Sequence, residues 1–160
     1  MSQLENMPKA ASISVFDLVD NCARVQKGQE VLILAHTDGL HGSDNVVDRD
    51  AIAWIETAVS NRGGNPSVLW IDEVAKPHSW RVPPIVKAAM KASDVFINNS
   101  FDIVTEENLE FRELVAECKI PMVRNFATTG PLLCTAWAQT PHELVGEIRY
   151  QSSLDIKDGA

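Results

Sequence analysis

The sequence lacks the features that would assign it to a secreted, membrane or zinc-ribbon class. Its three cysteines (Cys22, Cys118 and Cys134) are widely spaced and form no Cys-x-x-Cys pair, so neither a disulfide framework nor a zinc ribbon is expected. No apolar run approaches the ~20 residues of a membrane span. The first nine residues have neither the basic nor the apolar region of a signal peptide. We therefore expect a cytoplasmic protein with reduced thiols and no membrane partner.

Positive charge is also scarce. The chain has 14 Lys and Arg residues against 22 Asp and Glu residues, which gives a formal net charge of −8. Such a balance repels phosphate backbones and weighs against a nucleic-acid partner. With 160 residues, of which 45% are hydrophobic and 22% charged, the chain has the length and composition of one globular domain.

Helical and extended patterns alternate along this chain. This order predicts an α/β fold: a doubly wound, Rossmann-like parallel sheet of about four strands with helices on both faces. The domain is expected to span residues 1–150, with 151–160 as a tail or the start of a linker. The expected helices run from Ser14 to about Val25, Asp48 to Asn61, Pro83 to Ala92, Thr105 to about Cys118 and Thr140 to about Gln151; the expected strands are Val31–Ala35, Val68–Ile71, Asp94–Asn98 and Ile120–Arg124.

Three of the expected helices begin at recognisable capping signals. Ser14 followed by Asp17 resembles a capping box in which Asp replaces Glu, and Thr140 with Glu143 forms the usual one. Pro84 suits the first position of a helix, where a missing N–H costs nothing.

Ligands of open parallel sheets bind at the carboxyl ends of the strands. The loops that follow the four expected strands are rich in polar groups, and they supply our candidates for contacts with a small-molecule or peptide substrate. These candidates are His36, Asp38, His41, Asn98, Arg124 and Thr129.

The first of these loops permits two interpretations. His36, Asp38 and His41 are residue types that hold zinc or iron, but the histidines are five positions apart rather than the helical four, and Asp and Gly are also ordinary turn residues. The loop does not carry the Gly-x-Gly-x-x-Gly motif of dinucleotide-binding domains, since its glycines are Gly39 and Gly42 alone. Similarly, Arg124 could bind an anionic group or form an ion pair with one of the many acidic residues.

No residue is nominated as catalytic. Cys134 precedes His142 by eight positions, but a His in the first turn of a helix is more often a capping or surface residue than a general base. Cys22 and Cys118 fall on the expected buried faces of helices and are interpreted as small hydrophobic residues. Trp80 and Trp137 fall in loops, where tryptophans often mark an interface with another subunit or domain.

Several segments together carry a resemblance to a known family. They are Cys22–Leu34 with its Val-x-x-Gly-x-x-Val-Leu-Ile phrase, Arg62–Pro66, Ala88–Ile97, Arg124–Gly130 and the helix from Thr140. In order and spacing they resemble the amino-terminal domain of the leucyl aminopeptidase (aminopeptidase T)-like metallopeptidase family, which includes the 2,5-dihydroxypyridine dioxygenases.

This resemblance implies a metal-dependent aminopeptidase or a ring-cleaving dioxygenase, with a divalent metal (zinc, cobalt or iron) held by a carboxyl-terminal domain beyond Ala160. None of the family's metal ligands matches a position here, so no metal or other cofactor is expected on this chain. The amino-terminal domain would line the active-site cleft and support a homodimer. The rival hypothesis is a stand-alone small-molecule-binding or regulatory module without catalysis.

Overall fold

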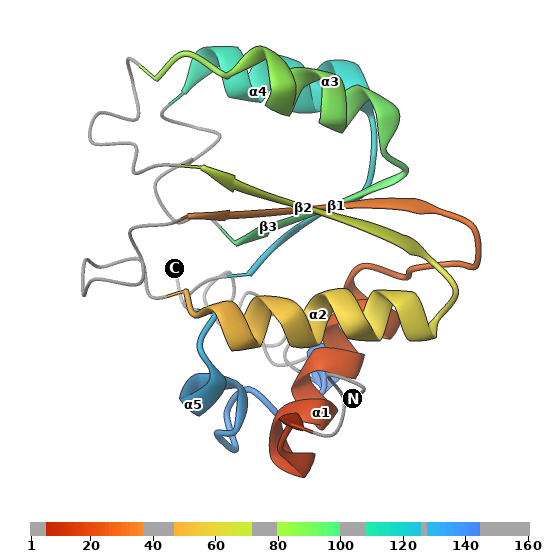
Figure 1. Ribbon diagram of the computed structural model, residues 1–160, viewed down its shortest axis with the longest axis vertical. Helices are drawn as coiled ribbons and strands as arrows, with labels where there is room; N and C mark the ends of the chain where they lie inside the picture. Colours follow the sequence, from red (N-terminus) through yellow and green to blue (C-terminus); the bar gives the residue numbers. More distant parts are fainter. Residues whose placement is uncertain (1–5, 37–46, 72–79, 100–107, 126–127, 145–160) are drawn as a thin grey trace, which may run out of the picture.

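The computed structural model describes residues 6–36, 47–71, 80–99, 108–125 and 128–144. Within these ranges the chain forms an α/β fold around one parallel sheet (Figure 1). None of the helices in the described ranges is both long enough and apolar enough to cross a membrane. In chain order the elements are α1 (Lys9–Asp17), the π-helix η2 (Leu18–Cys22), β1 (Glu30–His36), α2 (Arg49–Asn61), β2 (Asn65–Ile71), α3 (Pro84–Ala92), β3 (Val95–Asn99), α4 (Leu109–Cys118), β4 (Met122–Arg124) and α5 (Gly130–Leu133).

The four strands are parallel and lie in the order β2-β1-β3-β4. α3 and α4 cover one face of the sheet, and α1, α2 and α5 cover the other (Figure 1). The chain moves outward from β1 to β2 and then crosses back to β3, so the strand order reverses between β1 and β3. This confirms the predicted doubly wound architecture, and it places the crevice that such sheets offer to ligands at the carboxyl ends of β1 and β3.

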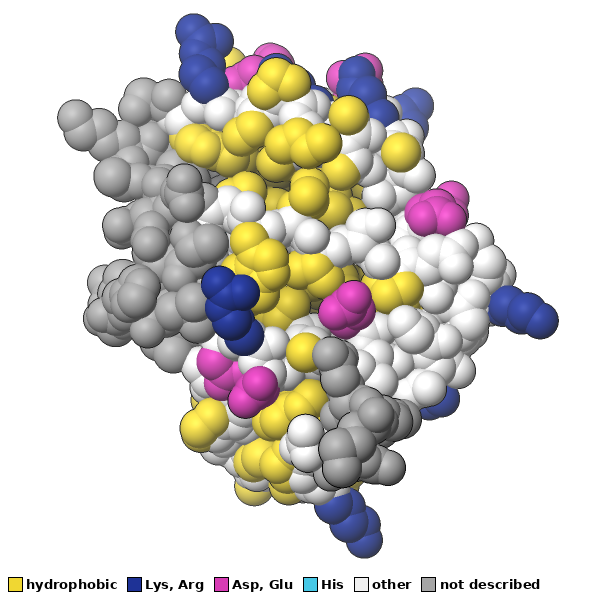
Figure 2. Space-filling model, in the orientation of Figure 1, with side chains coloured by type: hydrophobic (Ala, Val, Ile, Leu, Met, Phe, Trp, Pro, Cys, Tyr) yellow, Lys and Arg dark blue, Asp and Glu magenta, His cyan; other side chains and the backbone are white. Residues whose placement is uncertain are grey.

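Side chains of the central strands alternate between two cores. Val31 and Ile33 of β1 pack against α1 and α2, whereas Leu32 and Leu34 pack with Phe96 of β3 under α3 and α4. Burial on both faces explains why β1 is a continuous apolar run. The edge strand β2 is less buried, and Figure 2 shows a band of exposed hydrophobic side chains in the region of this edge.

Two predicted helix starts are confirmed. Asp48 is the N-cap of α2, and its Oδ1 accepts a hydrogen bond from the N–H of Ala51 at 2.6 Å. α3 has Pro84 at its first position, as expected. α4, by contrast, begins at Leu109 rather than Thr105, because Asn108 caps it by accepting from the N–H of Phe111 at 2.8 Å. The residues 105–107 themselves lie outside the described ranges.

The first helix differs most from its prediction. It begins at Lys9, and the Ser14 hydroxyl does not cap it but donates to the carbonyl of Leu133 in α5 at 2.8 Å. The expected capping box is therefore wrong: Ser14 is buried in mid-helix, where its hydroxyl needs a partner. The helix then widens into η2, which ends at Cys22, and two residues later Arg24 adopts a left-handed φ of 53°.

The carboxyl-terminal segment follows the prediction only in part. The short helix α5, capped by Thr129, was not predicted. Residues 142–144 are helical, and the predicted continuation to Gln151 lies outside the described residues. The Thr140 hydroxyl donates a hydrogen bond to the carbonyl of Ala136 at 3.2 Å, so its partner lies in the preceding turn.

Candidate functional site

Three predicted cleft residues lie on one face of the sheet at its carboxyl edge. Asn98 is in register with Leu34 of β1 and with Arg124 of β4, and His36 is the last residue of β1. Since side chains alternate along a strand, all three share the face of Leu34, beneath α3 and α4. The structure thus brings His36, Asn98 and Arg124 to the same side of the switch point.

Their exposure differs. His36 is 0% exposed and Asn98 is 1% exposed, whereas Arg124 is half-buried. His36 and Asn98 therefore present almost no surface to a ligand. Arg124 is the charged group of this set that solvent can reach.

On the opposite face, the carboxyl edge carries a hydrogen-bonded network around Asn99. The side-chain oxygen of Asn99 accepts hydrogen bonds from the Thr128 hydroxyl at 2.9 Å and from the side-chain amide of Asn125 at 3.1 Å. The Asn99 amide donates to the backbone carbonyl of Leu34 at 3.3 Å. Because Asn99 is only 2% exposed, these bonds compensate its burial and tie β1, β3 and the segment after β4 together.

Thr129, a fourth predicted cleft residue, lies beside this network. Its hydroxyl accepts from the N–H of Leu132 at 3.3 Å, so it serves as the N-cap of α5. Asp48 accepts from the N–H of Gly130 at 2.6 Å in addition to capping α2. One carboxylate therefore bridges the amino termini of two helices, where negative charge is favoured.

The remaining two candidates, Asp38 and His41, lie outside the described residues. A depression with a volume of about 360 Å³ lies on the first turns of α2 and is lined, among the described residues, by Asn6, Asp50, Ala53 and Trp54.

The two loop tryptophans differ in their environment. Trp80 packs its ring against Phe111, with ring centroids 6.1 Å apart, and accepts at its carbonyl from the Asn108 amide at 2.8 Å. Its role in the described fold is packing between the segment before α3 and the start of α4. Trp137, in contrast, is 79% exposed.

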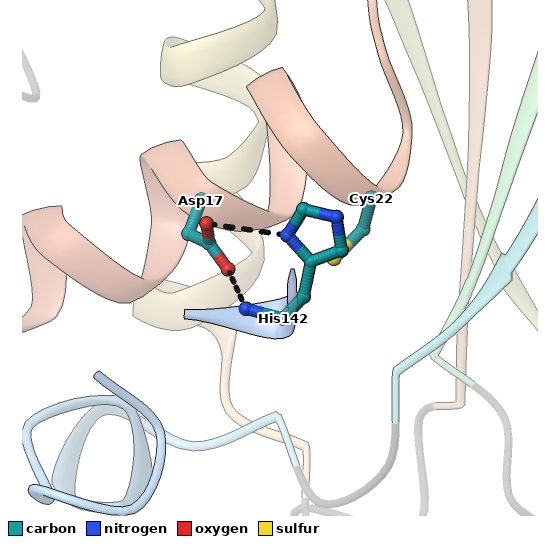
Figure 3. A group of neighbouring side chains, drawn as sticks. All are labelled: Asp17, Cys22 and His142. Carbon is teal, nitrogen blue, oxygen red and sulfur yellow. Dashed lines mark hydrogen bonds and ion pairs between the residues drawn. The ribbon is translucent and has the colours of Figure 1, made fainter. Parts of the chain in front are cut away.

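A further group of functional side chains was missed by the sequence reasoning. Asp17, Cys22 and His142 each place one potential ligand atom within 4.8 Å of the others (Figure 3). The sequence analysis considered His142 beside Cys134 without nominating either as catalytic, whereas in the structure it is Cys22 that lies near His142. His142 and Cys22 are 120 positions apart in the sequence, so only the fold could bring them together.

The thiol of this group is protonated in its ordinary state. Burial, and to a smaller extent the neighbouring carboxylate of Asp17, raise the pKa of Cys22. This is the opposite of the shift that activates a nucleophilic cysteine.

In comparisons with known proteins, no family model and no curated sequence matches this chain. Among solved structures, the chain is similar to 2,5-dihydroxypyridine dioxygenase from Pseudomonas putida KT2440, with a TM-score of 0.52 and 11% sequence identity over 72% of this chain. The match covers 33% of that protein. At this identity the likeness is one of fold alone.

Proposed function

We propose that this chain is the cleft-lining domain of a metal-dependent enzyme of the 2,5-dihydroxypyridine dioxygenase type. The observation that carries the proposal is the shared fold, which covers 72% of this chain but 33% of the dioxygenase. The short sequence motifs described above also resemble a family that includes these dioxygenases. The related aminopeptidase chemistry is the alternative within this proposal.

The carboxyl edge suits substrate binding better than metal binding. Its described polar groups on the α3–α4 side are one imidazole, one amide and one guanidinium, from His36, Asn98 and Arg124. A guanidinium repels a divalent cation, and a single imidazole does not make a metal site. In this proposal the catalytic metal is held by another domain, and the described residues of the carboxyl edge contribute no ligand to it.

The role we assign to Arg124 is binding an anionic group of the substrate. A guanidinium at the border of a buried floor can form two parallel hydrogen bonds with a carboxylate or share its charge with a phenolate oxygen. The homodimer that the resemblance implied belongs to the same proposal, with Trp137 as its candidate contact.

The proposal is tested with the protein encoded by the complete reading frame. We expect that frame to continue into a metal-binding domain, and the purified protein to consume 2,5-dihydroxypyridine when supplied with ferrous iron. Replacing Arg124 by Gln should raise KM by roughly 10-fold to 100-fold, the value of a hydrogen bond to a charged group. The exposed Arg112 provides the matched control, and Arg112→Gln should leave KM within about 2-fold.

Other outcomes discriminate between the alternatives. Peptide hydrolysis with zinc or cobalt, without ring cleavage, would move the protein to the aminopeptidase chemistry. A stop codon directly after Ala160 would overturn the two-domain proposal and favour a stand-alone binding module, whose ligands would then be sought as compounds that raise thermal stability.

A further inference from the structure

Three different metal-binding side chains converge where the first helix meets the carboxyl-terminal segment (Figure 3). Asp17 Oδ1 lies 3.6 Å from His142 Nδ1, and one ligand atom from each of Asp17, Cys22 and His142 lies within 4.8 Å of the others. A separation of 3.6 Å is too long for a hydrogen bond. It is close to the ~3.3 Å that separates two oxygen or nitrogen ligands placed ~2.0–2.1 Å from a tetrahedral zinc ion.

The π-helix η2 explains how Asp17 and Cys22 meet. In an α-helix, residues five positions apart point about 140° away from each other around the axis. In a π-helix, hydrogen bonds join residues five apart, so such residues lie on nearly the same side. The wide turn persists to the end of η2, where the N–H of Ala23 donates to the carbonyl of Leu18 at 2.8 Å.

The carboxylate of Asp17 is already held in place by neighbouring donors. Its Oδ1 accepts from the Asn21 amide at 2.6 Å, and its Oδ2 accepts from the backbone N–H of His142 at 3.3 Å. The second bond brings a residue 125 positions away onto the helix. Outer partners of this kind orient the ligands of metal sites, and they leave lone pairs on both oxygens.

We propose that Asp17, Cys22 and His142 form a zinc-binding site, with a water molecule as the fourth ligand. A thiolate, an imidazole and a carboxylate together are the donor set of zinc and not of magnesium or calcium, which prefer oxygen alone. The thiolate and carboxylate carry two negative charges, which balance those of the ion. The side chains of Asp17 and His142 are 21% and 31% exposed, so the group lies near solvent although His142 Nδ1 itself is buried.

Binding requires one proton transfer and a small contraction. The Cys22 thiol gives its proton to solvent as the sulfur–zinc bond forms, with no change in oxidation state. The ligand atoms, now spread over up to 4.8 Å, would draw in to the ~3.3–3.6 Å expected around a tetrahedral ion. This site is separate from the catalytic metal proposed above, and its presence or absence leaves the question of ring cleavage open.

The site is tested on the 160-residue chain with zinc alone and with cobalt(II) as a spectroscopic substitute. We expect saturable binding of one zinc per chain, measured by competition with a chromophoric chelator, and a thiolate-to-cobalt charge-transfer band. Cys22→Ala should remove the band and weaken zinc binding by more than ~100-fold, beyond the loss typical of an outer-shell change. Asn21→Ala, which frees the carboxylate of Asp17, should weaken binding by about 10-fold to 100-fold.

Cys118→Ala is the matched control, because Cys118 is also a half-buried thiol but lies on α4, on the other face of the sheet. It should retain both the band and the affinity of the wild type. Should Cys22→Ala fail to fold by circular dichroism, Asp17→Asn removes the anionic ligand while keeping an oxygen to accept from His142. Absence of one-to-one binding by the folded wild type, or a cobalt band that survives in Cys22→Ala, would overturn the site.

Discussion

Two polar regions of this domain look similar in composition but differ in how their groups are used. Around Asn99, at the carboxyl edge of the sheet, the side-chain oxygen and the side-chain amide are both engaged in hydrogen bonds. Around Asp17, at the junction of α1 and η2, His142 Nδ1 lies 3.6 Å from the carboxylate oxygen Oδ1, and the thiol of Cys22 lies nearby. The Asn99 network is nearly buried, whereas the Asp17 group is half-open to solvent.

This difference separates polar groups that hold a fold together from polar groups that can accept a ligand. A buried amide with its partners in place is costly to disturb and has little capacity left for a ligand. The Asp17 group differs because its carboxylate, thiol and imidazole, all in described residues, approach one another with no side-chain hydrogen bond among the three, so each keeps capacity for a ligand. At the carboxyl edge, Arg124 is therefore the residue we expect to bind a ligand. The Asn99 network, on the opposite face of the sheet, stabilises that edge.

The largest effect should come from breaking the Asn99 network. Asn99→Ala removes the partner of the Thr128 hydroxyl, the Asn125 amide and the Leu34 carbonyl in a nearly buried place. We expect a loss of about 3 kcal/mol in the free energy of unfolding, measured by urea denaturation. Zinc binding at Asp17, corrected for the unfolded fraction, should stay unchanged.

Asn65 provides the control for this substitution. The side-chain amide of Asn65 donates a hydrogen bond to Glu30 Oε1 at 2.8 Å. Unlike Asn99, Asn65 is exposed, at the start of the edge strand β2. Asn65→Ala should cost no more than about 0.5 kcal/mol. Equal losses at Asn99 and Asn65 would show that the buried network does not hold the sheet edge.

The sequence predicted the sheet and most helices because these depend on local patterns. Asp48 before an amphipathic stretch and Pro84 at a first helical position act within one turn of their own helix. Ser14 has the same local signature as a cap, but its hydroxyl is used by Leu133, which is 119 positions away. No pattern near Ser14 could reveal that contact.

The two polar regions were not equally predictable either. The strand-end rule nominated His36, Asn98 and Arg124 at the carboxyl edge, and the structure places the three on the same face of the sheet. The rule could not tell that His36 and Asn98 would be buried. The Asp17 group depended on a π-helical turn, and the only local signal was a carboxylate and a thiol five residues apart.

A smaller loss in the free energy of unfolding is expected at the contact between α5 and α2. A Cβ at Gly130 would lie 3.0 Å from Trp54 Cη2 and 3.3 Å from Cζ3, both closer than normal packing allows. Gly130→Ala should therefore destabilise the domain by about 1–3 kcal/mol in urea denaturation. Trp54→Phe removes both contacted ring atoms, so the double variant should lose less than the sum of the two single losses. Strict additivity would place the cause elsewhere than in this contact.

The smallest effect concerns the alkaline stability of the Asp17 group. Because burial and the neighbouring carboxylate of Asp17 raise the pKa of Cys22 in the folded state, the folded chain retains its thiol proton above the unfolded value of about 8.5. The resulting stability is fully present below that value and is lost as the pH rises through the folded-state pKa. Cys22→Ala should flatten this alkaline decline in denaturation measurements between neutral pH and the folded-state pKa.

Zinc makes the same measurement sharper, because it reverses the sign. A bound ion favours the thiolate and brings the folded-state pKa of Cys22 below the unfolded value. With saturating zinc, the contribution of Cys22 to stability should therefore rise with pH up to about 8.5 instead of falling beyond it. Cys118, whose pKa is also raised by burial, should keep its alkaline decline with or without zinc. If the pH dependence at Cys22 does not change with zinc, the thiol does not bind the ion, and the Asp17 group is a structural contact between the first helix and His142.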